Sequence, residues 1–233
     1  MDIPYFYITE SPAAGTQIAL KEDTSKHCIQ VLRMKAGEPL ILTNGLGALY
    51  HATITREDKR NCLVSIDKAE HTNAIPRKVT MGISLLKNAN RLEWFLEKAT
   101  ELGIAAIVPL ICHRTEKQYF RQDRMNNIVL SAMLQSKQTF LPVLSEPVSF
   151  DTFIQKHSSQ QNFIAHCIEA DKQTLNQFQL GNNLSILIGP EGDFTPDEIT
   201  LALQNNYQPI SLGNTRLRTE TAGIVAATLA VNL

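Results

Sequence analysis

Residues 184–199 read LSILIGPEGDFTPDEI, and they predict a strand, a tight loop and the first turn of a helix. The continuous apolar run from Leu184 to Ile188 has the length of a buried strand. Thr195-Pro196-Asp197-Glu198 predicts a helix start, because Thr caps well, Pro suits the first helical position and Glu completes a capping box. Gly189 and Gly192 allow a sharp turn and a close approach to a ligand between these elements. The stretch therefore predicts one strand–loop–helix unit of a parallel sheet.

The same alternation extends on both sides of this stretch, from residue 79 to the end of the chain. The apolar runs of strand length are Val79–Leu86, Ile104–Leu110, Phe163–Ile168 and Ile210–Leu212. The segments with helical apolar spacing are Ala89–Leu102, Arg124–Lys137 and a terminal helix from about Thr219. Strands that alternate with helices indicate an α/β domain with a mainly parallel sheet covered on both faces. Within the first of these helices we expect Trp94, Phe95 and Leu96 to lie in the core.

The first 70 or so residues have a different pattern, which is rich in short strands. Leu40–Thr43, Ala48–Thr55 and Cys62–Asp67 read as strands, and Asn44-Gly45 favours a hairpin turn between the first two. Thr24–Met34 has helical spacing. A small barrel with one helix is the natural interpretation, and the polar stretch 71–76, which ends in Pro76, predicts the domain boundary. We therefore expect two domains, residues 1–72 and 73–233.

The composition is that of a globular protein and excludes some classes of function. The chain has 233 residues, 43% of them hydrophobic and 19% charged, with a formal net charge of -1. A wholly basic nucleic-acid coat protein is therefore excluded, but a locally basic surface is not. Residues 73–150 hold 10 Lys and Arg against 6 Asp and Glu, whereas residues 151–233 hold 4 against 8. This division suits a protein that binds an anionic polymer with one surface and a cationic ligand with another.

Cysteine spacing and the N-terminus bear on the compartment. The four cysteines show no CxxC pattern and no His partner at metal-ligand spacing, so we expect buried thiols, with neither a zinc site nor a disulfide framework. No signal peptide is evident, and the longest apolar stretch, Ala222–Val231, is well short of the roughly 20 residues that a membrane span needs. We expect a soluble, cytoplasmic protein with no membrane partner and no metal.

A second loop, LGNTRLRTETAG at residues 212–223, also follows a predicted strand. Because ligands bind beyond the carboxyl ends of parallel strands, we expect this loop and residues 189–194 to meet at one small-molecule pocket. A structural alternative is a surface ion pair between Arg218 and Glu220 at the start of the last helix. For the first loop the alternative is a tight turn with a solvated Glu191. Spacing alone does not identify the ligand.

The paired motifs LIGPEGDFTPDEI (187–199) and LGNTRLRTETAG (212–223) resemble the two signature segments of the RsmE family. The resemblance continues through Lys87, Arg91 and the run Lys98–Gly103, and through His27, Val31–Met34 and Gly37, so it spans almost the whole chain. Members of that family are SPOUT-superfamily enzymes that methylate N3 of a uridine in 16S rRNA with S-adenosylmethionine. The resemblance implies a PUA-like RNA-binding β-barrel followed by a SPOUT α/β domain with a C-terminal trefoil knot, which dimerises.

Matching positions imply the site residues. The cofactor-binding residues would be Leu187, Ile188, Gly189, Pro190, Glu191, Gly192, Leu212, Gly213, Leu217, Arg218, Thr219, Glu220, Thr221 and Ala222. For catalysis, we expect Arg218 to favour the uridine anion and Glu220 to accept the N3 proton. Contacts to 16S rRNA, presented within the 30S subunit, are expected from Lys26, His27, Arg33, Lys35, Lys87, Arg91 and Arg216.

Two departures from the family pattern affect the RNA contacts. Asn214-Thr215 precede Arg216 where the second motif usually has an earlier arginine, and Lys137, Gln138 and Phe140 stand in a stretch that often carries arginines. Two alternatives to the main interpretation stay open at this point. One is another SPOUT RNA methyltransferase, acting on tRNA or on a ribose hydroxyl. The other is a non-catalytic RNA-binding module.

Overall fold

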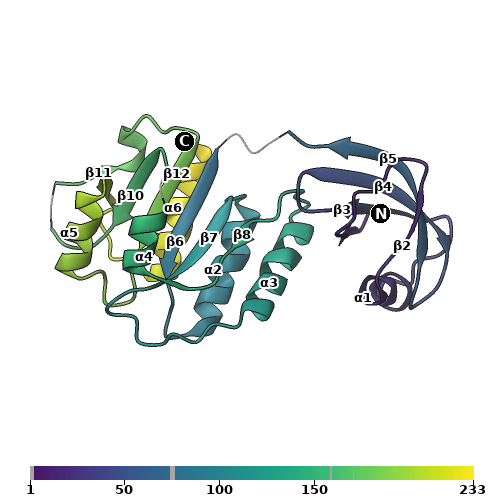
Figure 1. Cartoon of the computed structure of the whole chain (residues 1–233), viewed down its shortest axis with the longest axis horizontal. Coiled ribbons are helices and arrows are strands. Elements are labelled where there is room, and N and C mark those ends of the chain that lie inside the picture. Colours follow the sequence, from purple (N-terminus) through teal and green to yellow (C-terminus); the bar gives the residue numbers. More distant parts are fainter. Residues whose placement is uncertain (1–2, 74–76, 158, 170) are drawn as a thin grey trace. The chain divides into compact units, whose positions relative to one another are not determined.

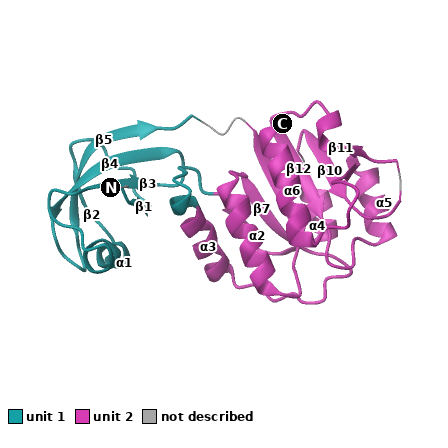
Figure 2. Ribbon diagram, turned by 180° about the vertical axis from the view of Figure 1, so that it is seen from behind, with its two compact units in different colours: residues 1–74, 133–141 teal, residues 75–132, 142–233 magenta. Residues whose placement is uncertain are grey.

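The computed structural model describes residues 3–73, 77–157, 159–169 and 171–233, and the chain divides into two compact units (Figure 2). The N-terminal unit comprises residues 1–74 and 133–141, and the α/β unit comprises residues 75–132 and 142–233. The boundary predicted at residues 71–76 falls partly on 74–76, which lie outside the described residues. Residues 133–141, far from the first 74 in sequence, thus belong to the N-terminal unit.

The N-terminal unit is built on a five-stranded sheet with the order β1-β3-β4-β5-β2. Its strands are β1 Tyr5–Tyr7, β2 Gln17–Ala19, β3 Pro39–Thr43, β4 Ala48–Arg56 and β5 Leu63–His71. The three predicted strands are confirmed, and two three-residue strands are added at the edges. The predicted helix is present as α1, Glu22–Lys26, continued by a π-helix, His27–Val31. The chain leaves it through Arg33, whose φ of 56° is left-handed.

The hairpin predicted at Asn44-Gly45 is covered by the segment that comes from later in the chain. The Gly47 N–H donates to the carbonyl of Thr139 at 2.8 Å, and the Leu141 N–H donates to the carbonyl of Gly45 at 2.8 Å. A Cβ at Gly47 would lie 2.6 Å from the ring of Phe140. Residue 47 must therefore be glycine for this segment to pack on the turn.

The α/β unit holds an eight-stranded sheet with the order β11-β13-β10-β12-β6-β7-β8, and β9 also pairs with β7. Each recorded pair in this sheet is parallel, as the sequence predicts. The strands are β6 Lys78–Ser84, β7 Ala106–Ile111, β8 Val143–Leu144, β9 Val148–Ser149, β10 Gln161–Ala165, β11 Gln173–Thr174, β12 Asn183–Ile188 and β13 Tyr207–Ser211. The helices are α2 Ala89–Glu101, α3 Gln122–Gln135, α4 Phe150–Lys156, α5 Pro196–Gln204, α6 Thr219–Asn232 and the short 3-10 helix Leu175–Gln177. The predicted fold class is confirmed, while the trefoil knot stays a prediction.

Helices cover both faces of this sheet (Figure 1). The last helix, α6, packs against α2 and against β6 and β12, the strands at the centre of the sheet. On the other face α4 and α5 pack together, and Phe150, Phe153 and Ile199 form a core with Leu187 of β12. Both faces of β12 are therefore buried, which explains its continuous apolar sequence.

One prediction for the helix α2, that Trp94 lies in the core, is wrong. Phe95 and Leu96 are fully buried as predicted, but Trp94 is 44% exposed. Leu92, Phe95, Leu96 and Ala99 follow the i, i+3, i+4, i+7 spacing of one helix face, and position 94 lies outside it. Among the described residues, none of the helices combines the length and the apolar character that crossing a membrane requires.

Gly223 permits the close approach of α6 to α2, and its substitution tests this packing. A Cβ there would lie 2.6 Å from the buried Phe95 ring and 3.1 Å from Ile83. We expect Gly223→Val to lower the free energy of unfolding by about 2 to 3 kcal/mol through overpacking. Chemical denaturation measures this, with Thr200→Val at an exposed position of α5 as the control. Equal stability of the two variants would contradict the packing described.

Candidate functional site

A pocket lies at the carboxyl ends of β10, β12 and β13, where three loops meet. It consists of a cavity of about 570 Å³ and an adjoining cavity of about 360 Å³. The two cavities have lining residues in common: Ala165, Cys167, Asp193, Arg216, Leu217 and Ala222. The combined space is in the range of small-molecule sites. The two loops singled out in the sequence therefore do meet, as predicted.

The first loop leaves β12 and folds over its own aromatic anchor. Gly189 and Pro190 are buried, and a Cβ at Gly189 would lie 3.1 Å from the Phe194 backbone nitrogen. The Phe194 side chain is fully buried and packs on Phe150, with ring centroids 5.3 Å apart. The Asp193 N–H donates to the Pro190 carbonyl at 2.9 Å and closes the turn. Small residues and a buried ring thus give the loop a fixed shape.

The carboxylate of Glu198 joins this loop to the end of β7. One oxygen accepts from the Thr195 N–H at 2.8 Å, which completes the predicted capping box, and the other accepts from the His113 N–H at 2.8 Å. Arg114, next in the chain, donates to the carbonyl of Gly192 at 2.6 Å and to that of Phe194 at 3.3 Å. The first loop is therefore held from both its helix side and its outer side.

Glu191 also has a structural contact. Its carboxylate accepts from the Lys87 N–H at 3.1 Å, while the Lys87 ammonium pairs with Glu116 at 2.7 Å. Glu191 is exposed, as the alternative of a tight turn with a solvated carboxylate expects, and it makes this contact in addition. The contact ties the rim of the pocket to the segment between β6 and α2.

The second loop ends at α6. There Glu220 pairs with Arg91, and not with Arg218 as the structural alternative in the sequence analysis had it. Glu220 is buried, with 8% exposure, and its Oε1 lies 3.6 Å from Nε of Arg91 on α2. Its Oε2 is buried without a hydrogen-bond partner among the described residues. The proposed Arg218–Glu220 surface pair is wrong, because residues two apart on a helix do not face each other. Arg218 is the N-cap residue of α6 and lines the smaller cavity.

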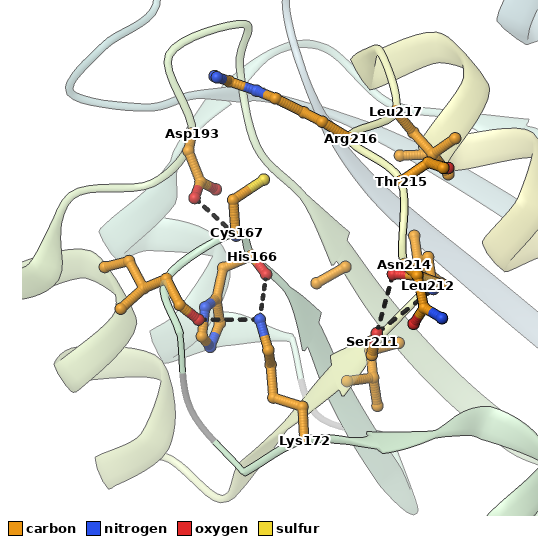
Figure 3. Close-up of a pocket in the computed structure, with 15 residues that line it drawn as sticks. His166, Cys167, Lys172, Asp193, Ser211, Leu212, Asn214, Thr215, Arg216 and Leu217 are labelled. Carbon is orange, nitrogen blue, oxygen red and sulfur yellow. Dashed lines mark hydrogen bonds between the residues drawn. The ribbon is translucent and has the colours of Figure 1, made fainter.

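The third wall of the pocket, Ala165–Ile168 after β10, was not predicted as part of the site (Figure 3). Lys172 supports it, since its ammonium donates to the carbonyls of His166 at 2.6 Å and Ile168 at 2.9 Å. Cys167 is exposed there, so the expectation of a buried thiol is wrong for it, although Cys28, Cys62 and Cys112 are buried. The available signal was the position of this segment at the end of a predicted strand.

Most of the residues expected to bind a cofactor line the pocket. Those that do are Ile188, Gly189, Pro190, Glu191, Leu212, Gly213, Leu217, Arg218, Thr219 and Ala222. The other four are not lining residues in the described part of the chain: Leu187, Gly192, Glu220 and Thr221. Leu187 lies in the core, and a Cβ at Gly82 would lie 2.7 Å from its Cδ2. Leu187 therefore supports the first loop from beneath.

The residues expected to bind RNA fall on both units. Arg91 and Arg216 line the pocket, and the Lys87 N–H contacts its rim. Lys26, His27, Arg33 and Lys35 are exposed on the N-terminal unit. There Lys26 pairs with Glu22 at 2.8 Å, Lys35 pairs with Glu57 at 3.3 Å and His27 packs edge-on against Phe6.

The pocket combines apolar side chains with backbone groups and carries charge of both signs. Ile188, Leu212 and Leu217 offer apolar contacts for a flat ring, and Asp193 offers a carboxylate beside the arginines. Within the described residues, no cluster of three or more His, Cys, Asp or Glu is arranged to hold a metal ion. The arrangement suits an organic cofactor with a ring and a charged tail.

Comparisons with known proteins agree with this geometry. Residues 73–231 match an RNA methyltransferase domain and residues 20–67 match an RNA methyltransferase PUA domain. The ribosomal RNA small subunit methyltransferase E of Rickettsia conorii is 30% identical over 94% of this chain and 91% of its own.

Two solved structures have the same fold over nearly the whole chain. A Legionella pneumophila protein with bound S-adenosylmethionine is 30% identical, with a TM-score of 0.90 over 99% of this chain and 97% of that one. The ribosomal RNA small subunit methyltransferase E of Neisseria gonorrhoeae, also bound to S-adenosylmethionine, is 28% identical, with a TM-score of 0.87 over 97% and 95%.

His166 should make the stability of the protein depend on pH. Burial, and then the nearby Lys172 ammonium, lower the pKa of His166 below its ordinary value of 6.5. As the pH falls below about 6.5, His166 is therefore protonated in the unfolded chain before it is protonated in the folded protein. Its contribution to the free energy of unfolding is lost as the pH falls from the unfolded-state pKa to the folded-state pKa.

We expect His166→Gln to lose less unfolding free energy than the parent protein between pH 7.5 and 5. Denaturation at several pH values measures this, with the parent protein at the same pH values as the reference. A His166→Gln variant with the parental slope would contradict the assignment.

Proposed function

This chain belongs to the RsmE family of RNA methyltransferases, and from that premise we propose that it methylates N3 of a uridine in 16S rRNA. S-adenosylmethionine would donate the methyl group. The observation that carries the proposal is the pocket, in which both signature loops meet at the carboxyl edge of the sheet. The names of the relatives support the small-subunit rRNA substrate, and the two homologous structures with bound S-adenosylmethionine support the cofactor.

The residues present fit S-adenosylmethionine. Gly189 and Gly213 leave room for backbone groups to approach an adenine ring, and Ile188, Leu212 and Leu217 cover its faces. When bound, the cofactor supplies a methyl group made electrophilic by a positively charged sulfur. Asp193, which lines both cavities, provides negative charge near such a cation. The protein's task is then mostly to position the two reactants.

Uracil N3 must lose a proton, and the side chains at the start of α6 are suited to assist. Arg218 lines the smaller cavity and would stabilise the anion of the base. We propose Glu220, which pairs with Arg91 through Oε1 and lies behind the pocket lining, as the proton acceptor. Arg91 holds this carboxylate in place beneath the cavity that Arg91 itself lines.

The N-terminal unit supports the choice of an RNA substrate. The PUA match at 20–67 includes Lys26, His27, Arg33 and Lys35, and we propose that these residues contact phosphates. Chemistry at N3 needs an unstacked base, which an assembled 30S subunit can present. The protein would act in the cytoplasm, with residues 1–72 contributing RNA contacts and residues 73–233 the chemistry.

The surface of α6 favours a homodimer. Its buried residues form one stripe, Thr219, Glu220, Gly223, Ala226, Ala227 and Ala230. The opposite stripe contains the half-buried apolar residues Ile224, Val225 and Leu229 together with the exposed Thr228. A helix that is apolar on all sides is normally buried all round. We propose that a second copy of this chain covers this face through the C-terminal domain.

The function predicts a defined product. With small subunits from a strain that lacks the enzyme, the protein and S-adenosylmethionine should yield N3-methyluridine, identified by nucleoside mass spectrometry. Arg218→Ala should lower turnover about 100-fold at saturating substrates, the loss that removal of one charge-stabilising group produces. Glu220→Gln should lower it similarly, because the amide cannot accept the proton.

Each alternative has its own outcome in this assay. A methylated ribose or a modified tRNA would establish another methyltransferase activity, and binding of RNA without any transfer would establish a binding module. Unchanged turnover of Arg218→Ala would remove that residue from the mechanism.

The dimer predicts that Leu229→Glu yields monomers. A charge at this position would have to be buried in the apolar interface, which is costly. Sedimentation at micromolar concentration measures the mass, and Leu203→Glu, at an exposed leucine of α5, should leave it unchanged. A parent protein that sediments as a monomer would contradict the proposal.

A further inference from the structure

Asp193 combines a left-handed backbone conformation with two side-chain hydrogen bonds to backbone N–H groups. Its φ is 65°, in the left-handed region where glycine is the ordinary residue. Its Oδ2 accepts from the Cys167 N–H at 2.8 Å, and its Oδ1 accepts from the Phe194 N–H at 2.9 Å. The carboxylate therefore connects the first loop, 189–194, to the wall after β10. A glycine would relieve the backbone strain but could not make either bond.

Lys172 holds the same wall from the opposite side. Its ammonium accepts no hydrogen bond and donates to the carbonyls of His166 and Ile168. The carboxylate of Asp193 can only accept, and it binds the N–H of Cys167, which lies between those carbonyls. One backbone group from each of three consecutive residues is thus held by two side chains of opposite charge. Figure 3 shows both side chains against this segment, with Asp193 and Lys172 on different sides of it.

We propose that Asp193 is a positioning residue for the cofactor, which holds the 166–168 wall against the first loop with the help of Lys172. The inference rests on the proposed function, because the pocket is taken to bind S-adenosylmethionine. Asp193, Cys167 and Ala165 line both cavities, so a shift of this wall changes the shape of the whole pocket. The contact between the Asp193 carboxylate and the Cys167 N–H explains why a strained aspartate stands at this position, since the contact needs an acceptor side chain.

The test is a substitution that separates cofactor binding from stability. We expect Asp193→Gly to raise the Kd for S-adenosylmethionine about tenfold, as loss of one hydrogen bond to a charged acceptor does. Its melting temperature should stay within about 2 °C of the parent, because relief of the left-handed strain offsets the lost bonds. Exchange of the Cys167 amide hydrogen should be faster than in the parent, because the amide loses its acceptor. Calorimetry, thermal denaturation and amide exchange give the three readouts.

Two control variants define the mechanism. Asn206 has a φ of 63°, is exposed and lies outside the lining of the pocket, so Asn206→Gly relieves similar strain and should leave the Kd unchanged. Asp193→Asn keeps one acceptor oxygen and tolerates left-handed φ, so it should bind S-adenosylmethionine more tightly than Asp193→Gly does, although it lacks the charge and the second acceptor. Lys172→Met should also raise the Kd for S-adenosylmethionine. In the double variant with Asp193→Gly the loss of binding free energy should be smaller than the sum of the two single losses, because both side chains act on one segment.

Three results would overturn the inference: parental cofactor affinity in Asp193→Gly, an equal loss in Asn206→Gly, or no rescue by Asp193→Asn. Failure of the proposed function has a different signature, because the parent protein itself would then bind no S-adenosylmethionine. Amide exchange at Cys167 needs no cofactor, so it tests the connection between loop and wall in either case.

Discussion

The buried carboxylate of Glu198 is the contact on which the first loop depends. It accepts from the Thr195 N–H at the start of α5 and from the His113 N–H at the end of β7. A buried carboxylate is costly unless such donors satisfy it, so the segments that provide them are held in fixed positions. With α5 and the end of β7 joined in this way, the end of the loop 189–194 is held against β7. The backbone of the pocket is therefore set by a side chain outside its lining.

Much of the fold could be predicted because the long elements carry local signals. The capping box Thr195–Glu198 marks the start of α5, and Gly103, with a φ of 85°, follows the last turn of α2 as predicted. Short elements were missed because few residues carry their pattern: β1 and β2 have three residues each, and α4 has seven. The packing of residues 133–141 on the turn at Gly45–Gly47 depends on contacts distant in sequence, which periodicity does not encode. The expected knot would depend on how the chain is threaded, which leaves no periodic signal in the sequence.

The site was partly predictable for a similar reason. Both signature loops contain glycines and charged residues, and the structure brings them to one pocket. The third wall contributes mainly backbone groups, so its composition gave little sign of a role. The ion pair of Glu220 with Arg91 was missed because the partner lies on another helix, α2, far away in the sequence. Exposure of Trp94 and Cys167 likewise follows from the tertiary position of each residue, which composition alone does not determine.

The acidic character of the C-terminal third has a different cause from the one inferred at first. Residues 151–233 hold 8 Asp and Glu against 4 Lys and Arg, which suggested attraction of a cationic ligand. In the structure, Glu191 accepts from the Lys87 N–H, Asp193 from the Cys167 N–H and Glu198 from the His113 N–H. Each of these carboxylates joins the stretch 191–198 to a different segment of the α/β unit. Each carboxylate accepts from a backbone N–H of another segment, so three of the acidic residues are explained by the assembly of the loops. Only Asp193 and Glu191 also line the pocket, and the charge available to a sulfonium is correspondingly smaller than the segment total indicates.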